Sequence, residues 1–154
     1  MSLIPRADAL RLTAAEINAF LGGAFAGAEE NLPSGVVELE PGRARVIRRA
    51  DAVSLRPGGV ISGPTMMSLA DVAVYALVLG HIGIVPMAVT TSLTIHFLRP
   101  ALPGDLVADA LLLRLGKRIA TAEVRLWTES PDKIAAHATV AYAIPSGGGI
   151  TSTS

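Results

Sequence analysis

The longest apolar stretch of the chain covers residues 65–79, in which Asp71 is the only charged residue. The apolar side chains fall on every face of a helix, and a helix of that kind is buried rather than half-exposed. Ser62 or Gly63 suits its N-cap, and Pro64 suits its first turn, where a missing N–H costs nothing. The pattern therefore predicts one long helix around which the fold is built.

The end of this helix is predicted at Gly80, a suitable C′ residue, which gives a length of roughly 27 Å from Ser62. Residues 72–95 contain no Asp, Glu, Lys or Arg, so a hydropathy window would also flag a membrane span there. Glycines, His81 and Pro86 interrupt that stretch, and after Pro86 the pattern changes from helical to alternating. We therefore interpret it as a buried helix, a loop and a strand.

A short helix and a hairpin are predicted before the long helix. Thr13 and Glu16 form a candidate capping box, which opens a helix that Gly22-Gly23 would end. Residues 36–40 and 43–49 have strand patterns and are joined by a Pro-Gly turn, which is typical of a β-hairpin.

Four strands in a meander are predicted after the long helix, at residues 88–99, 105–115, 119–128 and 134–144. The residues expected to share an apolar face of these strands are Leu93, Ile95 and Phe97, then Val107, Leu111, Leu113 and Leu115, then Ala120, Ala122, Val124 and Leu126, and finally Ala136, Ala138, Val140 and Tyr142. The second of these strands is apolar on both faces.

These elements predict an α+β fold in which a strongly curved antiparallel sheet wraps around one apolar helix. We expect a single domain over residues 1–145 and a flexible tail over residues 146–154, which is rich in Gly, Ser and Thr. Apolar residues on the outward strand faces call for a second subunit, so a homo-oligomer, either a dimer or a tetramer, is expected.

Composition narrows the classes of function. Lys and Arg together number 13 and so do Asp and Glu, which gives no case for a nucleic-acid partner. The absence of cysteine excludes disulfides, a thiolate nucleophile and a cysteine-based metal site. The three histidines have no metal-ligand spacing, and the N-terminus lacks the apolar region of a signal peptide. We expect a cytoplasmic protein with no metal site and no membrane partner.

Two groups of charged residues are each open to two interpretations. Asp71 is either a structural acid paired with an Arg or with backbone N–H groups, or a catalytic acid, base or nucleophile, because a buried unpaired carboxylate is costly. The strand at residues 43–49 carries four arginines. These either protect a solvated edge strand from aggregation or form a phosphate-binding rim; they are Arg43, Arg45, Arg48 and Arg49.

The sequence resembles a known family over residues 34–145. The segments GGVISGPTMMSLADVAVYA and AVTTSLTIHFLRPALPGD are similar to the hotdog-fold acyl-CoA thioesterases of the phenylacetate-degradation type. The family motif G-x-x-H-G-G, followed by four residues and L-A-D, is matched at Gly59, Gly63 and Leu69-Ala70-Asp71. The later pattern T-x-x-L-x-x-x-F-L-R-P is matched from Thr90 to Pro100.

The resemblance implies the hotdog fold and the hydrolysis of an acyl-CoA or aryl-CoA without any cofactor, since coenzyme A is part of the substrate. It implies that Asp71 activates water or attacks the thioester, and that the Gly63 N–H of the other subunit polarises the carbonyl. Thr90 or Thr91 would either hold the attacking water or be present only because Thr is a good strand residue. The residues expected to bind substrate are Arg56, Thr91, Ser92, Phe97, Lys117 and Arg118. Lys117 and Arg118 would lie near the phosphates of coenzyme A, or they form only a soluble turn.

Three positions depart from the family motif. Ser62 stands where the family has His, Pro64 replaces the second glycine of the pair, and Arg56 occupies a position where Asn is frequent. Ser62 is either only an N-cap or also a polar contact in the site. Two alternatives to a thioesterase follow: an acyl-CoA-binding hotdog protein that hydrolyses poorly, and a hotdog hydratase or dehydratase, whose chemistry usually needs an acid–His pair.

Overall fold

The computed structural model describes residues 6–24, 34–50, 53 and 55–146. The tail predicted to be flexible lies, from residue 147 on, outside the described residues. The elements of this part of the chain are α1 (Ala14–Ala24), β1 (Ser34–Glu40), β2 (Arg43–Arg48), β3 (Leu55–Arg56), β4 (Val60–Ile61), α2 (Gly63–Ile82), β5 (Val89–Phe97), β6 (Leu106–Leu115), β7 (Ile119–Trp127) and β8 (Ala136–Ala143). The sequence pattern did not predict the short pair β3–β4.

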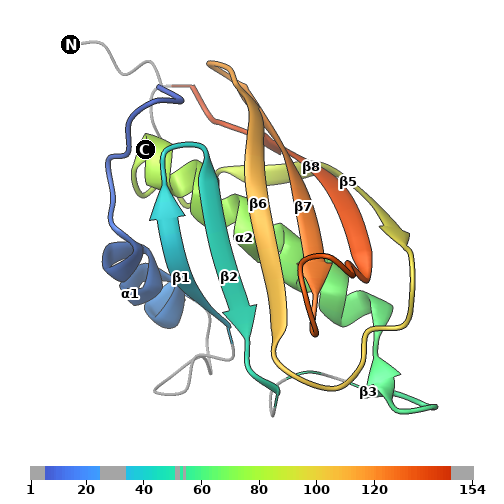
Figure 1. Ribbon diagram of the computed structural model, residues 1–154. Helices are drawn as coiled ribbons and strands as arrows, with labels where there is room; N and C mark the ends of the chain where they lie inside the picture. Colours follow the sequence, from blue (N-terminus) through green and yellow to red (C-terminus); the bar gives the residue numbers. More distant parts are fainter. Residues whose placement is uncertain (1–5, 25–33, 51–52, 54, 147–154) are drawn as a thin grey trace.

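One antiparallel sheet carries the fold, with the strand order β1-β2-β6-β7-β8-β5, and α2 packs across one of its faces (Figure 1). The predicted meander is correct for β6, β7 and β8 but wrong for β5, which pairs with β8 at the edge of the sheet. The connection at residues 98–105 contains two prolines and is longer than a hairpin turn, so it carries the chain from that edge across to β6, which lies beside β2.

The ends of α2 follow from local chemistry. Ser62 has extended backbone angles, and its side chain accepts a hydrogen bond from the Thr65 N–H, which makes it the N-cap. The predicted end at Gly80 is wrong: Gly83 ends the helix with φ +93°, a value that favours glycine. Gly80 serves close packing instead, because a Cβ there would lie 3.3 Å from the side chains of Leu10 and Leu39.

The predicted capping box of the first helix is confirmed. The Glu16 carboxylate accepts from the Thr13 N–H at 2.9 Å, and the Thr13 hydroxyl accepts from the Glu16 N–H at 3.2 Å. The helix runs on to Ala24, past the glycine pair predicted to end it.

The inward faces predicted for β7 and β8 are confirmed, since all eight residues named for them are buried against α2. In β6 the buried residues are Leu106, Ala108 and Ala110, so the apolar set named from the sequence lies mainly on the opposite face. A bulge after Leu112 changes the register, and Leu115 therefore packs against the core.

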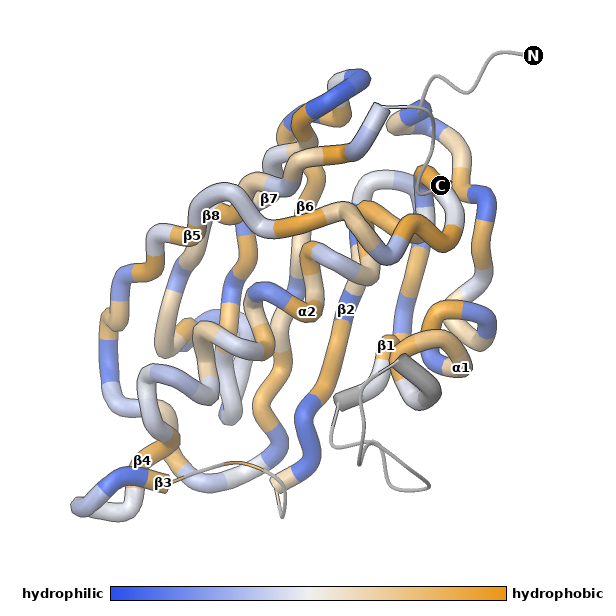
Figure 2. The backbone as a smooth tube through the Cα atoms, turned by 180° about the vertical axis from the view of Figure 1, so that it is seen from behind, coloured by the Kyte–Doolittle hydropathy of each residue, from blue (hydrophilic) through white to orange (hydrophobic). Residues whose placement is uncertain are grey.

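The helix α2 is the buried helix that the pattern predicted. It is long and apolar enough to cross a membrane, but 72% of the relevant window is buried inside the protein. Seen from behind, α2 lies in front of the sheet, and none of the described segments covers it from that side (Figure 2). On α2 the residues Pro64, Met67 and Ser68 are exposed.

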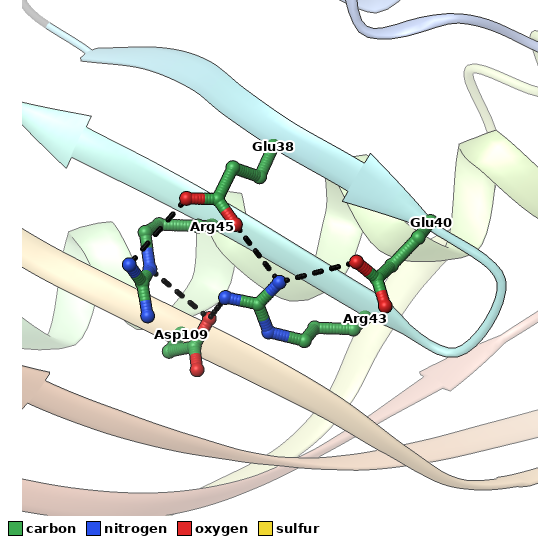
Figure 3. A network of polar contacts seen from close by, with 5 residues as sticks. All are labelled: Glu38, Glu40, Arg43, Arg45 and Asp109. Atoms are coloured by element: carbon green, nitrogen blue, oxygen red, sulfur yellow. Dashed lines mark hydrogen bonds and ion pairs between the residues drawn. The ribbon is translucent and has the colours of Figure 1, made fainter.

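The arginines of β2 do not lie on an edge strand, because β2 is paired on both sides, with β1 and with β6. Arg43 contacts Glu38 at 2.9 Å and Asp109 at 3.1 Å, while Arg45 contacts the same two acids at 3.4 Å each (Figure 3). The edge-strand interpretation is therefore wrong. Acids neutralise these two arginines, which weakens their case as a phosphate-binding rim.

Candidate active site

Asp71 lies half-buried on α2 and faces the junction of β5 and β8. The Thr90 hydroxyl donates a hydrogen bond to Asp71 Oδ1 at 2.6 Å, and the Tyr142 hydroxyl donates to the same oxygen at 2.7 Å. Hydrogen bonds to a carboxylate are short and strong. Among the described residues, none donates a hydrogen bond to Oδ2, so this oxygen is available for other partners.

The hydrogen-bond partners of Asp71 test the interpretation that it is a structural acid paired with an Arg or with backbone N–H groups. In the described part of the chain Asp71 forms no ion pair, and neither an Arg nor a backbone N–H binds its carboxylate. Within the described residues of one chain, Asp71 is therefore not an ion-paired structural acid. The carboxylate is held by two neutral hydroxyl groups on the open side of the central helix.

A β-bulge in β5 brings Thr90 to the carboxylate. The register shifts between Thr90 and Ser92, so that Thr90 lies opposite Tyr142 and Ser92 lies opposite Ala141. Tyr142 faces α2, and its partner Thr90 does so too, whereas Ser92 lies on the other face of the sheet. Thr91 donates to the Ala141 carbonyl at 3.3 Å. Of these three predicted residues, only Thr90 contacts Asp71.

Tyr142 is the residue that sequence reasoning missed as part of the site. Its side chain is buried, and its ring stacks on Tyr75 with centroids 5.7 Å apart and 21° between the planes. Burial above all, and also the hydrogen bond to Asp71, raise the pKa of the Tyr142 hydroxyl, which therefore stays protonated and can donate. The available signal was an inward-facing polar group on an otherwise apolar strand face.

The first turn of α2 leaves one backbone donor unused among the described residues. Pro64 has no N–H, and the N–H groups of Thr65 and Met66 bind the side chain and carbonyl of Ser62. The Gly63 N–H has no partner there, at the positive end of the helix dipole. The Phe97 ring lies against Gly63, since a Cβ at this position would be 3.2 Å from its Cζ atom.

Gly63 and Asp71 do not meet within one chain. They are eight residues apart on the same helix, which separates them by about 12 Å along its axis. A single chain thus offers two half-sites, one with a carboxylate and the other with a backbone donor.

The other residues predicted to bind substrate lie away from the Asp71 carboxylate. Arg56 is exposed on the β3–β4 hairpin just before α2. Lys117 and Arg118 are exposed in the β6–β7 turn, which lies at the opposite end of the molecule from β3 (Figure 1). Ser62 is the N-cap of α2, which was the first of the two interpretations given for it.

None of the three histidines is hydrogen-bonded to Asp71. His81 is buried at the end of α2, where it binds backbone groups of residues 6, 9 and 42. His96 and His137 are paired across β5 and β8, and His137 contacts Glu123 at 2.8 Å. Within the described residues no cluster of three or more His, Asp or Glu side chains is arranged to hold a metal ion.

Comparison with known proteins identifies the family. A profile of the thioesterase superfamily matches residues 58–135, which include α2 and the Asp71 motif. The chain is 35% identical to a proposed thioesterase from Silicibacter sp. TM1040, with a TM-score of 0.82 over 91% of this chain and 96% of that one. The chain belongs to the thioesterase superfamily, and its curved sheet around one helix is the hotdog fold.

Further solved structures extend the comparison. A mutant of the phenylacetic acid degradation protein PaaI from Thermus thermophilus is 31% identical, with a TM-score of 0.62 over 74% of this chain and 95% of that one. Zebrafish thioesterase superfamily member 2 is 18% identical with a TM-score of 0.73, over 87% of this chain and 99% of that one, and it shares the fold. No protein with a curated description matches the sequence.

Proposed function

We propose that this protein hydrolyses the thioester bond of an acyl-CoA or aryl-CoA and that Asp71 carries the chemistry. The observation behind this proposal is the Asp71 carboxylate, whose Oδ1 atom is held by two hydroxyl donors while Oδ2 has no donor among the described residues. Membership of the thioesterase superfamily supports the reaction class. Coenzyme A enters as part of the substrate, and we propose no metal or cofactor and a cytoplasmic site of action.

Two routes use the free oxygen of Asp71. In the first, Oδ2 takes a proton from water, the hydroxide attacks the thioester carbonyl, and the tetrahedral intermediate expels the thiolate of coenzyme A, which receives that proton. In the second, Oδ2 attacks the carbonyl itself and the thiolate of coenzyme A leaves. Water then hydrolyses the resulting anhydride, which restores the Asp71 carboxylate and releases the acid, whose proton goes to the thiolate. The Thr90 hydroxyl donates its hydrogen bond to Asp71, so the lone pairs of its oxygen would accept a hydrogen bond from the water in either route.

The oxyanion of either route needs a donor, for which we propose the Gly63 N–H of a second copy of the chain. One donor of this kind is worth about 3 kcal/mol in the transition state. The separation of Gly63 and Asp71 along α2 is the reason for invoking a second copy. Exposed apolar side chains on and beside the edge strand β5 support an interface there, among them Val89 (49% exposed) and Phe97 (50% exposed).

Binding of acyl-CoA without efficient hydrolysis is the second candidate. It is favoured by Ser62, which replaces the family His and whose side chain is engaged as the N-cap. A hydratase or dehydratase has less support, because none of the described histidines is hydrogen-bonded to Asp71 and each binds or faces other groups.

The experiment that separates these functions is a thiol-release assay over a panel of acyl-CoA and aryl-CoA thioesters. The wild type should release coenzyme A, and Asp71→Asn should lose about 10²-fold or more in turnover, the scale of losing a general base. Since no ion pair is broken, the variant should melt at or above the wild-type temperature. A wild type that binds the thioesters and releases no thiol would support the binding function instead.

A further inference from the structure

The Tyr142 hydroxyl is a polar group inside the core that the proposed reaction does not use directly. Tyr142 is 3% exposed, and it comes from the last strand of the sheet, far in sequence from the Asp71 motif. A buried hydroxyl has to be hydrogen-bonded. The Tyr142 hydroxyl donates to the Asp71 carboxylate at 2.7 Å, and the Asp71 backbone carbonyl is a more distant acceptor at 3.3 Å. The Tyr75 hydroxyl on the adjacent ring donates to the Pro86 carbonyl instead.

The geometry around the carboxylate is asymmetric. Thr90 and Tyr142 donate to one oxygen, Oδ1, at 2.6 and 2.7 Å, and they approach from two different strands, β5 and β8. Two donors on one oxygen fix the rotation of the carboxylate about its Cβ–Cγ bond. The second oxygen is thereby directed away from both donors.

The Tyr142 ring is itself held firmly. It stacks on Tyr75, which in turn packs against Phe20 with ring centroids 6.4 Å apart. The chain contains only two tyrosines, and both lie in this stack beside Asp71. Thr90, by contrast, lies on the exposed edge strand β5. Of the two donors to Asp71, Tyr142 is therefore the one anchored in the core.

We infer that Tyr142 is a positioning residue: its hydroxyl holds Asp71 Oδ1 so that Oδ2 is presented to the reacting groups. This inference rests on the proposed function for its kinetic meaning, whereas the orientation of the carboxylate can be tested without any turnover. Fixing a reacting atom in this way matters because a misplacement of about 1 Å can cost about 10²-fold in rate.

The test compares Tyr142→Phe with Tyr75→Phe. Each variant removes one hydroxyl and keeps the stacked rings, but only the Tyr142 hydroxyl contacts Asp71, whereas that of Tyr75 lies 3.5 Å from the Pro86 carbonyl. The expected result for Tyr142→Phe is a fall in kcat of about tenfold to a hundredfold with KM and melting temperature near the wild-type values. Tyr75→Phe should keep the wild-type kcat.

Crystal structures of the wild type and Tyr142→Phe provide the second measurement. The Asp71 carboxylate should change its rotation or occupy more than one orientation in the variant. An unmoved carboxylate, or equal kcat values for the two variants in an active enzyme, would overturn the inference. If the wild type hydrolyses none of the thioesters, the proposed function fails, and the carboxylate orientation in the two crystal structures still decides the role of Tyr142.

Discussion

At the scale of the residue, His81 shows how a single buried polar side chain can hold three segments together. Its Nδ1 atom lies 2.7 Å from the Arg6 carbonyl and 2.8 Å from the Ala9 carbonyl, while the Gly42 N–H donates to Nε2 at 3.1 Å. Since the Gly42 N–H can only donate, Nε2 is the acceptor and the ring proton is assigned to Nδ1. The ring joins the N-terminal segment and the β1–β2 turn to the end of α2.

Replacing His81 should destabilise the fold without touching the candidate site. In His81→Leu the Gly42 N–H loses its acceptor. This loss should lower the free energy of unfolding by about 1–3 kcal/mol. Urea denaturation at fixed protein concentration measures the loss. Lys133→Leu, a change at an exposed lysine in the β7–β8 loop, is the control and should stay within about 0.5 kcal/mol of wild type. Equal midpoints for the two variants would contradict the role of His81.

The candidate site was predictable from the sequence only in part. The charge of Asp71 inside an apolar stretch singled it out, and the family pattern singled out Thr90; the structure brings these two side chains into contact. Tyr142 was placed on an inward face, but its contact with Asp71 depends on how α2 packs against β8, which strand periodicity does not determine. A bulge likewise separates Thr90 from Ser92, and no alternation pattern reveals it.

At the scale of the element, the start of α2 offers a clean test of the backbone donor. Gly63→Pro removes the free N–H, and the extended backbone of Ser62 (φ −70°, ψ 149°) is compatible with a following proline. Gly63→Ala adds the same Cβ against Phe97 but keeps the N–H. Turnover should fall about 10²- to 10³-fold in Gly63→Pro, the usual cost of removing an oxyanion donor.

Steady-state thiol release, with circular dichroism to confirm folding, distinguishes the two Gly63 variants. Gly63→Ala should keep most of the turnover, and any loss it shows is attributable to crowding of the Phe97 ring. If both variants lose the same turnover, the N–H is not the oxyanion donor, and crowding at the helix start explains the effect.

The prediction of elements succeeded where local chemistry decides and failed where distant contacts decide. The N-cap at Ser62 and the capping box at Thr13 follow from side chains close in sequence. The end of α2 was wrongly predicted at Gly80. A glycine is needed there because the side chains of Leu10 and Leu39, which are remote in sequence, pack against it, and not because the helix ends. The position of β5 at the sheet edge was missed for the same kind of reason.

At the scale of the whole molecule, the positions of the Arg and Lys side chains indicate which of them are candidates for binding the phosphates of coenzyme A. Arg43 and Arg45 are paired with acids on neighbouring strands (Figure 3). Lys117 and Arg118 are exposed, and no ion pair to them is found in the described part of the chain. We therefore expect the β6–β7 turn to contribute more to phosphate binding than β2 does.

Replacing both Lys117 and Arg118 by Ala should weaken binding of coenzyme A, and the loss should be larger at low salt than at high salt because exposed charges are screened. Calorimetric titration at two ionic strengths measures this difference. Lys133→Ala, at an exposed lysine in the β7–β8 loop, is the control. Unchanged affinity in the double variant would leave these residues as a solvated turn.

The separation of Gly63 and Asp71 along one helix leads to a prediction about the assembled protein. In a symmetric dimer, each site would take its carboxylate from one chain and its N–H from the other. Asp71→Asn and Gly63→Pro should then each be inactive alone. Mixed in equal amounts and allowed to exchange subunits, they should form hybrid dimers with one intact site, and turnover should return to about a quarter of the wild-type value if exchange is statistical. Sites confined to single chains would regain no activity on mixing, and light scattering that shows only monomers would exclude the shared site at once.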